Sequence, residues 1–128
     1  MVALLGESEK DIVAVVDKCG PSDLTTSAMN PVQALTVLRA FGTLPGPALR
    51  RLSPLYGVHK GMPPFLLIHG ERDSLVPLAQ SKALAERLRA AAVPVELIVV
   101  KNAGHDFKVH GIEERLAERI ADFLARSL

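Results

Sequence analysis

The chain has 128 residues, of which 48% are hydrophobic and 23% charged, and a net charge of +1, which is typical of one ordinary globular domain. Its basic residues are dispersed and its aromatic residues are four Phe and one Tyr, so nothing indicates a nucleic-acid-binding protein. No apolar run approaches the roughly 20 residues that span a bilayer, and the single cysteine, Cys19, excludes an internal disulfide.

The N-terminal stretch "MVALLG" lacks the basic flank and the length of a signal peptide, and it is typical of the end of a helix. The first strand is predicted at Ile12–Val16, a largely β-branched run that Gly20-Pro21 stops. An apolar run without polar alternation favours a strand buried on both faces, as in parallel sheets. We therefore expect the chain to begin inside a larger fold, which leaves the compartment of the protein open.

The segment 24–61 contains four prolines and several glycines, and we interpret it as a helical excursion between two strands. Pro31 is predicted to open a helix, with Leu35, Leu38 and Phe41 among its apolar positions.

The second half of the chain alternates strands with helices. Strands are predicted at Phe65–Ile68 and at Val95–Val100. Between them, Pro77 marks the first turn of a helix that Pro94 ends. The apolar face of that helix is predicted to contain Leu84, Leu88 and Ala92.

A last helix is predicted after Gly111. Its inward residues are expected to be Leu116, Ile120, Phe123 and Leu124. Glu113 and Glu114 near its start and Arg126 near its end match the helix dipole.

This order of elements predicts an α/β fold, with three parallel strands and flanking helices. The first strand would leave an apolar edge unpaired, which native proteins usually cover. We therefore expect the N-terminal strands of the sheet to be absent from this chain.

Two polar residues follow successive predicted strands. Asp73 comes after Ile68 and His105 comes after Val100, at the same interval. Because the carboxyl ends of parallel strands share one rim, where ligands collect, we expect the two side chains to meet there. A carboxylate that orients an imidazole is the acid–base part of a nucleophilic triad. The simpler alternatives are a turn aspartate that caps the next helix and a solvated loop histidine.

The segment Pro63–Phe107 resembles the C-terminal part of an α/β-hydrolase. It is most similar to prolyl-oligopeptidase-like and dienelactone-hydrolase-like esterases, including bacterial feruloyl and acetyl-xylan esterases. In that family HGxxDxxVP supplies the triad acid and AGHxF supplies the base, and the two motifs stand here at His69–Pro77 and Ala103–Phe107. "VDKCGPSDL" and Ser53-Pro54 extend the resemblance upstream, so that it covers nearly the whole chain. The resemblance implies the catalytic residues Asp73 and His105 and no cofactor.

The nucleophile of that family is missing from this sequence. Its serine stands in G-x-S-x-G, on a sharp turn between a strand and a helix. "GESEK" has Lys10 in place of the second glycine, so by this alignment the chain starts just downstream of its nucleophile. The glycine-rich oxyanion loop is missing as well. Losing one oxyanion donor alone costs roughly 10²–10³ in rate, so we expect the isolated chain to be inactive or nearly so.

Other candidate residues have simpler explanations. A metal site of His69, Asp73, His105 and His110 lacks any helical HxxxH or CxxC spacing. His69 is predicted to be structural, and His59 and His110 are predicted to lie on the surface. Cys19 could be imagined as a replacement nucleophile, as dienelactone hydrolases use cysteine, but it follows the wrong strand and is predicted to be a small buried residue. Phe107 could line an acyl pocket or pack in the core. The serines Ser8, Ser22, Ser27 and Ser74 are expected to act as caps and in turns.

Three hypotheses follow for the function. The first is a C-terminal portion, residues 1–128, of an α/β-hydrolase domain that acts on small-molecule esters or, as second choice, peptides, without nucleic acid or membrane as partner. The second is a non-catalytic module that pairs with a partner chain, or with itself, through its exposed strand edge. The third is a two-chain enzyme whose serine comes from another polypeptide.

Overall fold

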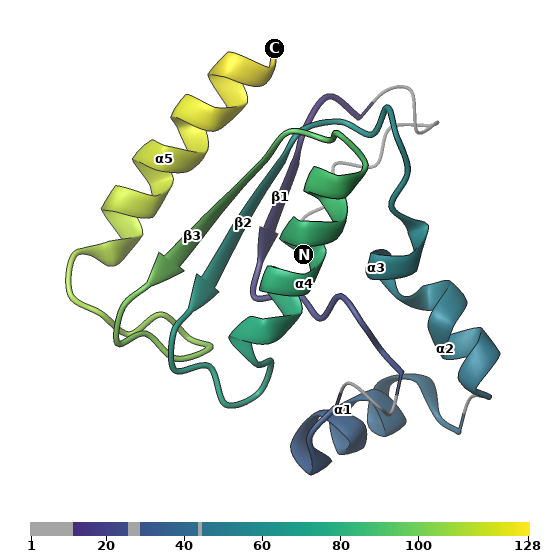
Figure 1. The fold of residues 1–128 in the computed structure, drawn as a ribbon. Helices are drawn as coiled ribbons and strands as arrows, with labels where there is room; N and C mark the ends of the chain where they lie inside the picture. The colour runs from purple at the N-terminus through teal and green to yellow at the C-terminus, as the bar shows by residue number, and fades with distance from the viewer. Residues whose placement is uncertain (1–11, 26–28, 44) are drawn as a thin grey trace.

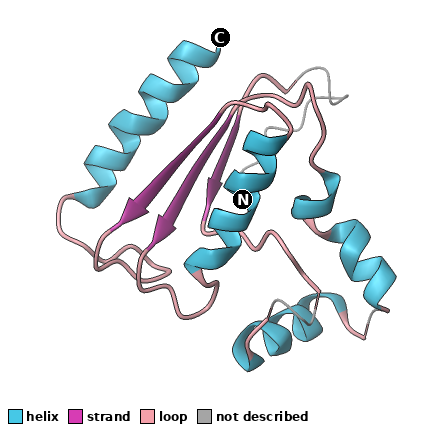
Figure 2. Ribbon diagram, in the orientation of Figure 1, coloured by secondary structure: helices cyan, strands magenta, loops and turns pink. Residues whose placement is uncertain are grey.

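A computed structural model describes residues 12–25, 29–43 and 45–128 of the chain. It contains three strands and five helices, and three of the helices lie between the first two strands (Figures 1 and 2). In chain order they are β1 (Val15–Lys18), α1 (Pro31–Phe41), α2 (Gly46–Leu52), α3 (Pro54–Gly57), β2 (Phe65–Gly70), α4 (Leu78–Ala90), β3 (Val95–Val100) and α5 (Ile112–Ser127). None of the helices in these ranges is long and apolar enough to cross a membrane.

The three strands form one parallel sheet in the order β1-β2-β3, which confirms the predicted fold class. Val15 pairs with Phe65, and β2 pairs with β3 from Phe65↔Val95 to Gly70↔Val100. Figure 1 shows all three strands pointing the same way, so the loops after them lie at one rim. Asp73 and His105 belong to two of these loops.

The sheet is covered by one long helix on each face (Figure 1). On one face, Leu66 and Ile68 of β2 pack with Leu116 and Phe123 of α5. On the other face, Phe65 and Leu67 of β2 pack with residues of α4, chiefly Leu84 and Leu88. Because β2 is central and every residue in it is buried, it needs an apolar side chain on both faces. Burying one such side chain contributes about 1.5–3 kcal/mol.

Three predicted boundaries were wrong. Strand β2 continues to Gly70, two residues beyond the predicted end at Ile68. The first strand runs from Val15 to Lys18, later than the predicted Ile12–Val16, because its pairing with β2 includes two polar residues, Asp17 and Lys18. Ala92 lies beyond the end of α4 and is exposed, with a positive φ of 58° in the turn before β3. The strand Val95–Val100 and the helix after Gly111 were predicted correctly.

Helix α1 begins at Pro31, as predicted. Its first turn is closed by a capping box, in which Asn30 Oδ1 accepts from Gln33 N–H and Gln33 Oε1 accepts from Asn30 N–H. The apolar residues Leu35 and Leu38 of this helix are nonetheless 46% and 49% exposed. Their spacing indicated a helix correctly, but it did not indicate a buried face.

Candidate active site

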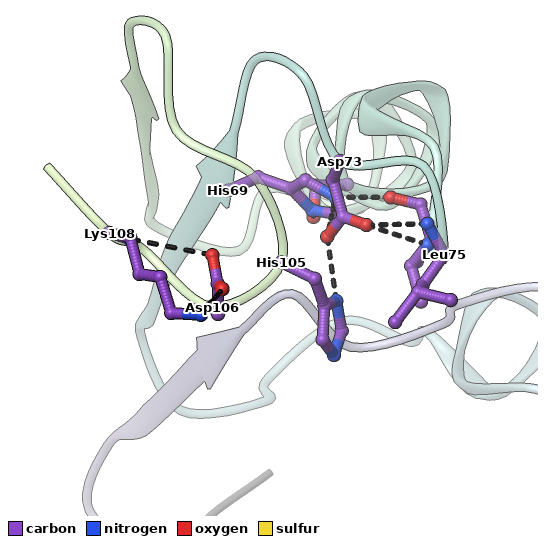
Figure 3. Close-up of polar contacts among 8 residues, drawn as sticks. His69, Asp73, Leu75, His105, Asp106 and Lys108 are labelled. Carbon is purple, nitrogen blue, oxygen red and sulfur yellow. Dashed lines mark hydrogen bonds and ion pairs between the residues drawn. The ribbon is translucent and has the colours of Figure 1, made fainter.

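Asp73 lies in the loop between β2 and α4, and its carboxylate is held from both sides (Figure 3). Its Oδ1 accepts hydrogen bonds from the backbone N–H groups of Leu75 (2.9 Å) and Val76 (2.8 Å). Its Oδ2 accepts from Nδ1 of His105 at 2.7 Å. The contact that the sequence predicted between Asp73 and His105 is therefore present. The turn-capping alternative for Asp73 also describes part of what it does, because Oδ1 closes the turn before α4.

The donors around Asp73 favour its charged form. Burial raises the pKa of the carboxyl group, but hydrogen bonds from Val76, His105 and the Cys19 thiol outweigh this effect. The pKa of Asp73 consequently lies below its ordinary value of 3.8, and the group is an anion at neutral pH. A buried anion beside an imidazole is the arrangement that stabilises an imidazolium.

His105 lies in the loop after β3, and its side chain is 42% exposed. Because ionised Asp73 can only accept, Nδ1 of His105 carries the proton of this hydrogen bond. In the neutral ring Nε2 is then left as a proton acceptor, and no described residue forms a hydrogen bond with it. In Figure 3 the far end of the ring points away from Asp73. The geometry leaves a base that is oriented at one nitrogen and accessible at the other.

Gly70 allows the two loops to approach each other. A Cβ at this position would lie 2.5 Å from the carbonyl oxygens of both Ala103 and Gly104, the two residues before His105. The loops are also joined by a backbone hydrogen bond from Arg72 N–H to Ala103 O (2.9 Å). The glycine of the first motif therefore has a steric role in bringing the second motif close.

His69 ends β2 and is fully buried. Its Nδ1 lies 2.6 Å from Ser81 Oγ, on α4, and its Nε2 lies 2.7 Å from the carbonyl oxygen of Val76. The prediction that His69 is structural is confirmed. His59 and His110 are exposed, as predicted.

Cys19 follows β1 at the same rim and is 3% exposed, which confirms that it is a small buried residue. Its thiol forms a hydrogen bond with Asp73. Burial raises the pKa of the thiol to about 11, so it is a neutral donor rather than a nucleophile at neutral pH. Sequence reasoning missed this contact, although the position of Cys19 after a third parallel strand could have indicated it.

The described residues bring the possible metal ligands Cys19, His69 and Asp73 together, with their donor atoms within 4.8 Å of one another. This group differs from the set weighed from sequence, since it includes neither His105 nor His110. Its donor atoms are already engaged in hydrogen bonds with one another or with Val76 and Ser81.

The remaining candidates have structural places. Phe107 is 2% exposed within the core cluster on the α5 face, so core packing is its role. Ser22 donates to the carbonyl oxygen of Gln80 at 2.7 Å and ties the loop after β1 to α4. Ser8 and Ser27 lie outside the described residues.

Comparison with known proteins identifies the family. The model of the prolyl oligopeptidase family matches residues 1–128. Esterase LipQ of Mycobacterium tuberculosis is 43% identical over 75 residues, which cover 56% of this chain and 18% of that protein. A truncated carbohydrate esterase from gut microbiota superposes with a TM-score of 0.70 at 26% identity, over 91% of this chain and 42% of that one.

An acylaminoacyl peptidase of Pyrococcus horikoshii superposes with a TM-score of 0.73 at 26% identity, over 91% of this chain and 20% of that one. This chain thus spans less than half the length of each of these relatives. The fold is a partial α/β-hydrolase fold, as the sequence predicted, and the relatives are esterases and peptidases. The chain belongs to the prolyl oligopeptidase family.

Proposed function

We propose that this chain supplies the acid and the base of a serine hydrolase that cleaves carboxylic esters. Nε2 of His105 takes the proton of a serine hydroxyl as that oxygen attacks the ester carbonyl, and later returns it to the leaving alcohol. Asp73 keeps the ring in the required tautomer and stabilises the imidazolium. Water is the second substrate, and no cofactor is implied.

One observation carries this proposal. The buried Asp73 carboxylate accepts from Nδ1 of His105 at 2.7 Å, while that imidazole remains 42% exposed. A solvated loop histidine would need no such partner, and a turn aspartate would need only the amides of Leu75 and Val76. The three relatives, two esterases and one peptidase, support an ester substrate first and a peptide second.

The nucleophile has to come from elsewhere, because the sequence contains no G-x-S-x-G. In this proposal, a strand and elbow that belong to the rest of the protein, or to a second chain, bring the serine and the oxyanion donors to the rim. The DNA directly upstream of Met1 distinguishes these sources. An open frame with a strand followed by G-x-S-x-G indicates one protein, and a stop codon with a ribosome-binding site indicates a separate chain.

The direct test is to produce the chain together with the polypeptide encoded upstream and to measure hydrolysis of p-nitrophenyl acetate. We expect turnover that His105→Ala lowers roughly 10³-fold or more, because the general base is lost. The matched control is His110→Ala, which removes an exposed histidine from the same loop and should leave the rate unchanged. Turnover that survives His105→Ala would refute the proposal.

A non-catalytic module is the second candidate. Among the described residues β1 has a strand partner on one side only, and Val13 just before it is 51% exposed. If this edge serves to bind a partner chain, co-production should yield a stable complex without any turnover. Sedimentation velocity on the purified mixture, run beside the ester assay, separates this outcome from the first.

A further inference from the structure

A second imidazole stands beside the candidate acid. Nε2 of His69 lies 3.4 Å from Oδ2 of Asp73, the same oxygen that accepts from His105. Both His69 and Asp73 have side chains with no exposed surface, whereas His105 is partly open to solvent. We propose that His69 is a positioning residue, a neutral imidazole in the Nε2–H tautomer that holds Asp73 in place for His105.

The hydrogen bonds of His69 assign its tautomer. The carbonyl oxygen of Val76 can only accept, so Nε2, 2.7 Å away, carries a hydrogen. In a neutral ring Nδ1 is then an acceptor, and it takes the hydroxyl hydrogen of Ser81 at 2.6 Å. Every polar atom in this buried group has a partner in that arrangement, as buried groups require. The same Nε2–H presents its positive end to Oδ2 of Asp73.

His69 is fully buried and cannot itself reach a substrate at the rim. What it does is connect three parts of the fold: the end of β2, the first turns of α4 through Ser81, and the Asp73 loop through Val76. Val76 also donates its N–H to Oδ1 of Asp73 at 2.8 Å. One residue, Val76, is therefore held by His69 through its carbonyl group and holds Asp73 through its amide group.

This inference rests on the proposed function, since positioning matters to catalysis only if His105 is the base. If His69 were removed without a substitute, the carbonyl group of Val76 would lose its partner and the loop could rotate. Asp73 would then no longer present Oδ2 to Nδ1 of His105. A neutral histidine side chain without such a partner prefers the Nε2–H tautomer, in which His105 would have no acceptor nitrogen facing the rim.

The first measurement uses the 128-residue chain itself. Long-range ¹H–¹⁵N spectra distinguish protonated from bare ring nitrogens in all four histidines. At neutral pH we expect opposite tautomers, Nε2–H for His69 and Nδ1–H for His105. A His69 ring found as Nδ1–H, or with both nitrogens protonated, would overturn the proposal whatever any variant does.

The second measurement compares two uncharged substitutions. His69→Gln places an amide N–H near the position of Nε2 and can still donate to Val76. His69→Asn is shorter, reaches only toward Ser81, and leaves Val76 O unpaired. We expect His105 to keep its Nδ1–H signature in His69→Gln and to lose it in His69→Asn. Amide spectra and thermal unfolding of both variants show whether the fold is retained.

The results for the two variants distinguish a role of His69 in positioning Asp73 from a role in the stability of the whole fold. If both variants unfold, the tautomers of the intact chain still decide the proposal. If both fold and His105 stays Nδ1–H in His69→Asn, then His69 does not position the acid and the proposal is wrong. These spectra need no turnover, so the tautomers can stand even if the hydrolase assay fails, and the reverse also holds.

Discussion

Two buried aspartates lie at the same end of the sheet and meet different surroundings. Asp73, after β2, is 8% exposed, and both of its oxygens accept hydrogen bonds. Asp17, within β1, is 9% exposed, and its Oδ1 has no hydrogen-bond partner among the described residues. The exposed fractions of the two residues are therefore nearly equal, whereas the number of hydrogen-bond donors around them differs.

The pKa values of the two carboxyl groups are shifted in opposite directions. Burial raises the pKa of Asp17 above 3.8, and the smaller opposing effects, such as the Gly20 N–H and the nearby His69, do not outweigh it. At Asp73 the hydrogen bonds outweigh burial and the pKa falls below 3.8. The comparison teaches that well-placed donors can outweigh the cost of burial and lower the pKa of a buried acid. The acid with the lowered pKa is the one that binds His105.

The largest effect is expected from placing a side chain between the loop after β2 and the loop after β3. Gly70→Ala would place a methyl group 2.5 Å from the carbonyl oxygens of Ala103 and Gly104. These are backbone atoms, so they could move away only if the loop that contains them were displaced. We expect the free energy of unfolding to fall by about 3 kcal/mol. Urea unfolding measures it, with Gly57→Ala as control, because a Cβ there meets nothing within 4 Å. Equal stability of the two variants would show that the loops do not meet as described.

The second-largest effect is expected from removing the charge of Asp73. Asp73→Asn should lower the free energy of unfolding by about 2 kcal/mol at pH 7, since hydrogen bonds to a charged group are worth about 1.5–3 kcal/mol. A lowered pKa contributes stability that is present above 3.8 and is lost as the pH falls through the folded-state value. The deficit of the variant should therefore shrink in acid.

Unfolding in urea at a series of pH values tests this linkage. Asp106→Asn serves as the control, because Asp106 pairs with Lys108 on the surface, where such pairs contribute little. A deficit of Asp73→Asn that stays constant down to strongly acid pH would contradict the assigned charge.

The smallest effect should have the opposite sign. Asp17→Asn removes a carboxyl group that is costly to ionise, and we expect the free energy of unfolding to rise by about 1 kcal/mol at pH 7. A raised pKa contributes stability that is present below 3.8 and is lost as the pH rises through the folded-state value. The advantage of the variant should consequently vanish toward acid pH. The same urea series measures it, and a destabilised variant at neutral pH would mean that Oδ1 of Asp17 has a donor partner.

Much of the fold could be predicted because its signals are local. Apolar runs marked β2 and β3, and Pro77, Pro94 and Gly111 marked where α4 and α5 begin or end. The position of β1 could not be read in the same way. Its pairing with β2 includes Asp17, and a polar residue inside a strand interrupts the apolar pattern.

The candidate site was predictable in part for the same reason. Asp73 and His105 follow strands, so topology alone indicated that they meet. The donors to Asp73 other than His105 left little trace in the sequence. Two of them are backbone amides, at Leu75 and Val76, and the third is the thiol of Cys19, far away in the chain. The steric need for Gly70 depends on a loop more than thirty residues later, which no local pattern contains.

The span from Phe65 to Phe107 has a consequence for engineering. It contains β2, α4 and β3 together with the acid, the base, and every described donor to the acid except Cys19. Such a unit could be transplanted as one piece onto another parallel sheet. The host would have to offer a neighbouring strand, a helix in the place of α5 to cover the second face of β2, and a small donor in the place of the cysteine.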